Sequence, residues 1–376
     1  MKAIGMYIFG GSQTIGHLLE GWEIDTILEM TNDMIDHNAY HFHKNYPNID
    51  IKLPADMTNE YLDTLVNKYD LLFANPPCSG LSTINRNANV NNEVNKYIYN
   101  VIDVANKIKP KIFFIENAPT LTSIGLPILK NIAKAVHDDY YLLIINDKAG
   151  NHNVPMYRRR TFVIGFNKTY FKGIPKLNTE YVTCTVADIL STIDLTHNKE
   201  FLDDSDTTLF KYYDMINNGD SLYRTLATNE VEDIPDSIKS NIDKFKYKLD
   251  NGLRIWDKSP SKLCLDGYVP SLTSLSRLIH PIENRDLYIR EYAAIMGYPN
   301  NFIFYADECK TPTVQCIAQG VPVNFIRYIS KELMNSFSRI DYLDGEIVYI
   351  NQTNANNVKI KIYKTLNDFS NTLTII

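Results

Sequence analysis

Apolar and polar positions along the first 166 residues follow two periods, one typical of strands and one typical of helices. Short apolar runs predict strands at 4–9, 25–29, 49–53, 71–74, 111–115, 140–146 and 160–166. Apolar residues at helical spacing predict helices at 15–20, 32–46, 59–68, 92–108 and 126–138. Strands separated by helix-length segments predict an α/β fold, so we expect a doubly wound parallel sheet with a Rossmann-like arrangement.

The pattern weakens after residue 166, where the chain becomes polar and rich in Asn and Asp. The segment 167–254 carries fifteen acidic residues against eleven basic ones, an excess of four acids. We interpret this stretch as a second, smaller domain or a large insertion. Helical spacing returns at 289–296 and 321–334, and the tail is expected to contain two short strands, 345–351 and 358–363.

Composition narrows the class of protein. The chain has 376 residues, of which 44% are hydrophobic and 22% charged, as is typical of a globular protein. It has no apolar run of the ~20 residues that a membrane helix needs, and its five scattered cysteines lack metal-ligand spacing. We therefore expect a reduced, cytoplasmic setting and no metal. The net charge of −6 argues against nucleic-acid binding by composition alone, so such a function must depend on local basic patches.

Several polar residues fall where predicted strands end. A glycine turn at Gly10-Gly11 follows the first strand, Glu29 ends the second, and Asp56 follows the third. The carboxyl ends of the strands form the ligand-binding edge of such a sheet, and a glycine turn lets a cofactor approach the backbone. Each acid alone is more simply a solvated strand-end residue. The ordered set of glycine turn, acid and acid indicates an adenosyl cofactor.

The fourth strand leads into Asn75-Pro76-Pro77-Cys78-Ser79-Gly80-Leu81-Ser82. Two prolines stop the strand and fix the backbone, so Cys78 is held on a rigid turn at the same edge of the sheet. That is a suitable position for a nucleophilic thiol. A buried structural cysteine is the simpler interpretation of Cys78 in isolation.

Two further groups complete the candidate chemistry. Glu116 follows a wholly apolar strand, where a carboxyl group tends to have a raised pKa and can share a proton with a ligand. A helix cap or turn acid is the ordinary alternative. Arg158 and Arg160 share one face if they lie on a strand, and together they suit a phosphate or a base carbonyl. A solvated basic edge is the ordinary alternative for them.

Residues 1–166 and about 256–335 resemble the cytosine-5 DNA methyltransferases. The motifs that carry the resemblance occur in the family's order: Phe9-Gly10-Gly11, Asn75-Pro76-Pro77-Cys78, Glu116-Asn117-Ala118, Arg158-Arg159-Arg160, the 285–291 segment with Met296-Gly297-Tyr298-Pro299, and Gly320-Val321-Pro322. The loop Ser79-Gly80-Leu81-Ser82 departs from the common Gln-x-Phe-Ser of the family. Such departures indicate a divergent, phage-type branch.

The resemblance implies a role for each site residue. Cys78 is the nucleophile, and Glu116 protonates or hydrogen-bonds the cytosine ring at N3. Arg160 holds O2 of the base and the cysteine loop, and Arg158 supports it. The implied cofactor is S-adenosyl-L-methionine, contacted by residues from both ends of the matched region: Phe9, Gly11, Glu29, Asp56, Asn75, Pro77, Gly320 and Val321.

The resemblance also implies a division of the chain. It places the catalytic and cofactor-binding domain at 1–166, a target-recognition domain at 167–255, motifs that pack back on the catalytic domain at 256–335, and a C-terminal extension at 336–376. The implied reaction is methyl transfer to C5 of a flipped cytosine in double-stranded DNA, through a covalent adduct between Cys78 and C6. The implied enzyme is a monomer in the cytoplasm of a bacterium or a phage-infected cell.

Three alternatives stay open. One is the same chemistry on RNA, as in a tRNA-type relative, since duplex DNA prefers a basic face and the segment 167–255 is acidic. Another is a non-catalytic relative that binds DNA without turnover, although it would not need Cys78, Glu116 and Arg160 together. The third is methylation of a free pyrimidine nucleotide, which would leave the middle segment without a purpose.

Overall fold

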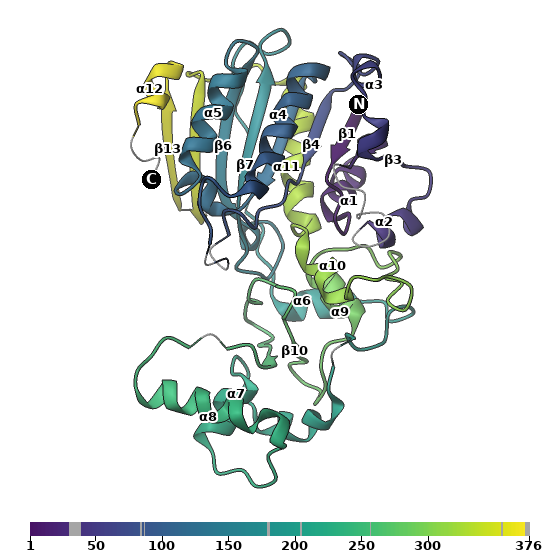
Figure 1. The fold of residues 1–376 in the computed structure, drawn as a ribbon, viewed down its shortest axis with the longest axis vertical. Coiled ribbons are helices and arrows are strands. Elements are labelled where there is room, and N and C mark those ends of the chain that lie inside the picture. The colour runs from purple at the N-terminus through teal and green to yellow at the C-terminus, as the bar shows by residue number, and fades with distance from the viewer. Residues whose placement is uncertain are drawn as a thin grey trace. The chain divides into compact units, whose positions relative to one another are not determined.

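The computed structural model describes residues 1–29, 39–82, 85, 87–178, 181–203, 205–255, 257–354 and 356–372. The chain divides into two compact units (Figure 1). Unit 1 comprises 1–154, 158–183 and 320–376, and unit 2 comprises 155–157 and 184–319. Within the described residues, no helix is long and apolar enough to cross a membrane.

Unit 1 is built on one large sheet. Among the described residues nine strands pair in the order β13-β12-β6-β7-β5-β4-β1-β2-β3. All neighbouring pairs are parallel except those made by β7 and β13, which run antiparallel to their neighbours. Their bounds are β1 Lys2–Met6, β2 Glu23–Leu28, β3 Asp50–Lys52, β4 Leu71–Ala74, β5 Ile112–Asn117, β6 Tyr140–Lys148, β7 Arg159–Asn167, β12 Ile347–Asn354 and β13 Asn357–Tyr363. A small pair, β8 Ile174–Pro175 with β11 Tyr342–Leu343, lies apart from it.

Helices cover both faces of this sheet. On one face α4 (Lys96–Ile108), α5 (Leu126–Val136) and α12 (Leu366–Ser370) bury their apolar sides in a common core with the sheet (Figure 1). On the other face α1 (Ser12–Leu19) and α11 (Val323–Asn335) pack together. There a Cβ on Gly16 would lie 2.6 Å from Ile326, so only glycine allows the two helices to approach this closely. The remaining helices of unit 1 are α2 (Tyr40–Asn45) and α3 (Asn59–Asp63).

Unit 2 has its own apolar core. Its helices are α6 (Val186–Leu190), α7 (Leu222–Thr228), α8 (Asp236–Asp250), α9 (Ile289–Ile295) and α10 (Thr313–Gln319), and its strands are β9 (Ser261–Lys262) and β10 (Leu278–Ile279). Helices α7 and α8 pack through Leu222, Leu226, Ile242 and Phe245. The apolar residues of α8 recur at helical spacing, at Ile238, Ile242, Phe245 and Leu249, so the weak periodicity expected for 167–254 is wrong for this part of the segment.

The expected α/β class is confirmed, together with most strands and helices to within a few residues. The helix predicted at 59–68 was too long, because α3 ends at Asp63 and Asn67 adopts a left-handed conformation with φ of 59°. The first strand ends earlier than predicted, since Tyr7 and Phe9 are also left-handed. Residues 32–38 of the helix predicted at 32–46 lie outside the described residues, and α2 forms its end.

Two strand predictions missed a pairing. The strand predicted at 111–115 continues through Glu116 and Asn117, because β7 pairs with β5 as far as Asn117↔Thr161. The sheet was predicted to be parallel, yet β7 enters between β5 and β6 in the opposite direction. Glu116 is therefore held by a ladder on the strand and does not lie on a loop beyond it.

Candidate active site

The cysteine loop leaves the end of β4 and is held by groups from the next strand. The Asn75 N–H donates to the Met6 carbonyl at 3.2 Å, which continues the sheet for one residue beyond Ala74. The Asn117 side chain donates to the Pro76 carbonyl at 3.2 Å, and the Thr120 hydroxyl donates to the Leu81 carbonyl. These bonds hold both ends of the turn, and the Cys78 side chain is partly exposed on it.

Glu116 and Arg160 face one another because of the register between β5 and β7. Glu116 lies directly opposite Phe162, and side chains two residues apart on a strand share a face, so Arg160 is the diagonal neighbour of Glu116. Arg160 Nε lies 2.5 Å from Glu116 Oε1. Their side chains are only 15% and 4% exposed, so this ion pair is largely withdrawn from water.

The charges of this cluster act on Cys78 and on Glu116. Burial raises the pKa of the Cys78 thiol, the Arg160 guanidinium lowers it, and the Glu116 carboxylate raises it. Burial likewise raises the pKa of the Glu116 carboxyl, and Arg160 and Arg158 oppose that shift. The buried site therefore favours a neutral thiol and a protonated acid, while the two arginines favour the charged forms.

Arg158 belongs to the same group, although it precedes β7 and is not on the strand. Its side chain is buried, and its charge lowers the pKa values of both Cys78 and Glu116. Its backbone carbonyl accepts a hydrogen bond of 2.8 Å from the Ala149 N–H. The structure thus brings together the four residues predicted to be catalytic, all within unit 1.

The glycine turn predicted to receive a cofactor is strained and tightly enclosed. Gly11 has φ of 81°, and a Cβ at this position would collide with the Phe42 ring. Phe9 is left-handed as well, with φ of 45°. Glu29 is fully buried, and one of its oxygens accepts the Ile8 N–H, so this acid shapes the turn. Left-handed non-glycine residues are costly and tend to occur where function requires them.

The other predicted cofactor residues differ in their surroundings. Asn75 is buried, and Pro77 is partly buried beside Cys78. Asp56 is exposed and accepts the Leu53 N–H at 3.2 Å, so its carboxylate caps its own turn. Gly320 and Val321 are buried and lead directly into α11, which packs against α1.

Sequence reasoning missed a buried pair behind the arginines, His152 and Asp147. His152 lies in a loop with no regular pattern, and the strand predicted at 140–146 stops just before Asp147, whereas β6 continues to Lys148. The available signal was Asp147 itself, a charged residue at the end of an apolar run. Nothing in the sequence, however, showed that its side chain would be buried. His17, another buried histidine, was hidden in the same way within α1.

Comparisons with known proteins identify the family of the chain. A family model for C-5 cytosine-specific DNA methylases matches residues 7–335. The type II methyltransferase M.XorII of Xanthomonas oryzae is 23% identical over 377 residues, which cover 90% of this chain and 86% of the relative.

Solved structures agree in fold. A prophage-encoded Escherichia coli protein, described as a DNA modification methyltransferase, superposes with a TM-score of 0.60 at 19% identity, covering 90% of this chain and 100% of its own. The Dnmt2 methyltransferase of S. pombe superposes with a TM-score of 0.57 at 13% identity, covering 89% and 98%. At these identities the structures establish the fold alone. The family model extends from the glycine turn through the cysteine loop to α11, and the chain therefore belongs to the C-5 cytosine-specific DNA methylases, as a DNA cytosine-5 methyltransferase.

Proposed function

We propose that this enzyme transfers a methyl group from S-adenosylmethionine to C5 of a flipped cytosine in double-stranded DNA, through a covalent bond between Cys78 and C6. The observation that carries the proposal is the enclosed cluster in which Cys78 shares its surroundings with the Glu116–Arg160 ion pair. A thiol, an acid and a cation are the three groups that this chemistry requires.

The proposed steps balance in atoms and charge. The Cys78 thiolate adds to C6 while Glu116 gives its proton to N3, so the electrons of the C5–C6 double bond become available at C5. C5 would then take the methyl group that the cofactor supplies, and the electron pair of the broken S–C bond would stay on the sulfur, which becomes a neutral thioether. A water molecule takes the C5 proton, the electrons of that C–H bond restore the C5–C6 double bond and expel the thiolate, and Glu116 takes back the N3 proton. Arg160 holds the Glu116 carboxyl in place and donates to O2 of the base.

The thiol must lose its proton before it can add, and the raised pKa of Cys78 opposes that loss. Arg160 and Arg158 act in the required direction, because their positive charges lower the pKa of the thiol. A thiol that is neutral until the target base arrives is protected from unwanted alkylation and oxidation. We therefore infer that the thiolate forms when the base enters the pocket.

The strand edge suits the proposed cofactor. Helix α1 begins after Gly11, which has no side chain to cap the first N–H groups, so these donors are available to a carboxylate at the helix N-terminus. Glu29 and Asn75 end the strands on either side of β1 at the same edge. We propose that these residues, with Phe9, Pro77, Gly320 and Val321, hold the cofactor, which supplies a methyl group on a sulfonium. Asp56 would need to leave its own turn to take part.

The acidic character of the middle segment is the main difficulty for a DNA partner, and unit 2 offers an answer. A cleft of about 240 Å³ is lined by the exposed lysines Lys244, Lys248 and Lys258 over a floor that includes Phe245. The one acid in its lining, Asp257, already accepts bonds from Ser221 and Ser259. We propose that this lysine cleft contacts backbone phosphates, as part of target recognition by the segment 167–255 together with the residues that directly follow it.

Covalent trapping tests the proposal. A duplex with 5-fluorocytosine at its target cytosines should form a stable adduct with the enzyme and S-adenosylmethionine, because fluorine cannot leave C5 as the proton does. Random-sequence duplexes are used, since the recognition site is unknown. Cys78→Ser is the control and should form none. An adduct with a fluorinated RNA and none with DNA would replace the DNA substrate by RNA, and no adduct with either would refute the covalent mechanism.

A further inference from the structure

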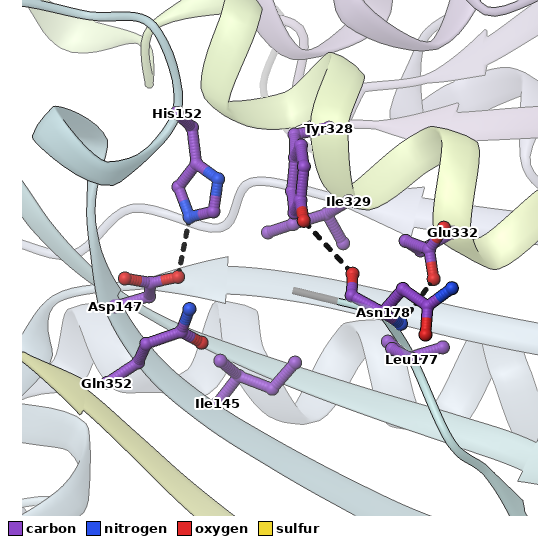
Figure 2. Close-up of a pocket in the computed structure, with 9 residues that line it drawn as sticks. All are labelled: Ile145, Asp147, His152, Leu177, Asn178, Tyr328, Ile329, Glu332 and Gln352. Atoms are coloured by element: carbon purple, nitrogen blue, oxygen red, sulfur yellow. Dashed lines mark hydrogen bonds and ion pairs between the residues drawn. The ribbon is translucent and has the colours of Figure 1, made fainter. Parts of the chain in front are cut away.

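A buried carboxylate and imidazole lie behind the arginines of the active site. His152 Nε2 is 2.6 Å from Asp147 Oδ2, and the two side chains are 1% and 3% exposed (Figure 2). A carboxylate has no proton to give, so the imidazole donates through Nε2. Beside the pair is a small cavity of about 20 Å³, lined also by Gln352 and Tyr328. Such a pair is costly to bury, and that cost calls for a reason.

Asp147 stands directly beside Arg160. The register pairs Asp147 on β6 with Arg160 on β7, and residues directly opposite on neighbouring strands share a face. Glu116 on β5 is the diagonal neighbour of Arg160 on that same face. Arg160 therefore has an acidic residue on each neighbouring strand, Asp147 on β6 and Glu116 on β5. Of these two, Glu116 forms the ion pair, at 2.5 Å.

The lone pairs of Asp147 are largely occupied by other donors. One oxygen accepts the Lys148 N–H at 2.7 Å and the Asn151 side chain at 2.6 Å. The other accepts from His152. A carboxylate has about four lone-pair positions, so three donors leave little capacity for a guanidinium. These donors also fix the turn after β6, where the Ala149 N–H holds the Arg158 carbonyl.

His152 is itself held by helix α11. Its ring stacks on Phe325 with 5.0 Å between centroids and lies tilted against Tyr328 with 4.3 Å between centroids. Phe325 also packs edge-on against Phe162, the residue of β7 that lies opposite Glu116. Helix α11 thus fixes the orientation of the His152 ring, whose Nε2 donates to the Asp147 carboxylate.

We propose that His152 is a positioning residue that keeps Asp147 from competing for Arg160, so that Arg160 remains paired with Glu116 in the active site. This inference rests on the proposed function, because Glu116 and Arg160 are assigned their roles there. A pair that merely stabilises the fold would need both members equally. If Asp147 is instead a competitor for Arg160, its charge should lower activity once His152 is gone, and removing that charge should restore activity.

The test compares three variants of the full chain. His152→Phe keeps an aromatic ring between Phe325 and Tyr328 but removes the donor, which frees Asp147 to draw Arg160 away. We expect kcat for DNA methylation to fall by about tenfold to a hundredfold, the range for a misplaced catalytic group, with the KM for the cofactor little changed. Adding Asp147→Asn removes the competing charge, so the double variant should turn over at least several times faster than His152→Phe.

His17→Phe is the matched control. His17 is also buried, and its Nδ1 lies 2.9 Å from the hydroxyl of Ser330, which follows Tyr328 by two residues in α11 and so points to a different side of the helix. This variant should lower the melting temperature while leaving kcat unchanged. If His152→Phe does not fold, Asn151→Ala replaces it, since Asn151 is the other side-chain donor to Asp147, and the same rescue by Asp147→Asn is expected.

The outcomes separate the two proposals. A wild-type enzyme that forms no adduct with fluorinated DNA or RNA refutes the proposed function. An active wild type whose double variant is no faster than its single variant refutes the role of His152, and so does an unchanged kcat in His152→Phe. In either of these two cases the pair is a structural one, and the function stands.

Discussion

Replacing Glu116 by Gln removes the proposed proton donor while keeping its shape. The Gln carbonyl can still accept from Arg160, whose Nε lies 2.5 Å from the present carboxylate oxygen. Exchanging a largely buried ion pair for a bond to a neutral acceptor should lower the free energy of unfolding by roughly 1 kcal/mol. The fold and the proposed cofactor site, which is assigned to other residues, should therefore persist.

Turnover should fall much further than stability. Loss of a general acid slows a reaction by about 10²–10⁴-fold, which corresponds to roughly 2.7–5.5 kcal/mol of barrier. The intrinsic reactivity of Cys78 should change in the other direction. In the enzyme without DNA, where Glu116 is ion-paired with Arg160, its carboxylate raises the pKa of the thiol, so removing that charge lowers the thiol pKa and increases the thiolate fraction at a fixed neutral pH.

Two assays on the same preparation separate these effects. Single-turnover methyl transfer to DNA measures the chemical step, and mass spectrometry of Cys78 after timed iodoacetamide treatment without DNA measures thiolate reactivity. Glu23→Gln, a change at an exposed position of β2, is the matched control and should alter neither rate. Slower transfer with faster alkylation is the expected result. Unchanged transfer would refute the acid role, and slower alkylation would refute the electrostatic reasoning.

Three further predictions concern the supports of the site. Burial lowers the pKa of His17 to about 3, so the neutral ring stabilises the fold above pH 6.5, and this stabilisation is lost as the pH falls towards 3. In the wild type the free energy of unfolding should therefore fall by about 1.4 kcal/mol per pH unit between those values, and His17→Phe should remove that slope. Gly16→Ala should destabilise by about 1–3 kcal/mol in urea titrations, and adding Ile326→Ala should relieve part of the clash. Replacing Lys244, Lys248 and Lys258 by Gln should reduce the slope of log affinity against log salt by about 0.9 for each phosphate that the variant no longer neutralises, and an unchanged slope would remove the cleft from the interface.

The predictable parts of the fold were those in which local pattern and tertiary context agree. The run Leu71–Ala74 is wholly apolar and followed by two prolines, and it forms β4 with the predicted bounds. Helix α5 was predictable because its apolar positions all face one core. It starts where predicted and ends two residues earlier. The sequence order of Cys78, Glu116 and the arginines could be read in the same way, since each lies next to an apolar run.

Pairing between distant segments was not predictable. The tail strands were expected, but their sequence does not show that β12 would join β6 in parallel and so extend the main sheet. The left-handed conformations of Tyr7 and Phe9 also have no local cause, because neither residue type favours positive φ. Both features depend on contacts that only the assembled sheet supplies, such as the bond from the Ile8 N–H to Glu29.

The register of β7 decides which arginine of the strand lies on the same face as Glu116. Arg160 shares a face with Glu116, whereas Arg159 points to the opposite face and donates to Asn351 at 3.0 Å. A slip of one residue in the pairing would exchange those faces and place a different side chain beside the acid. The turn between β6 and β7 must therefore keep the register as well as connect the strands. The bonds that the Lys148 N–H and the Asn151 side chain donate to Oδ1 of Asp147 at the start of that turn provide such a constraint, and an Asn at position 147 could still accept them.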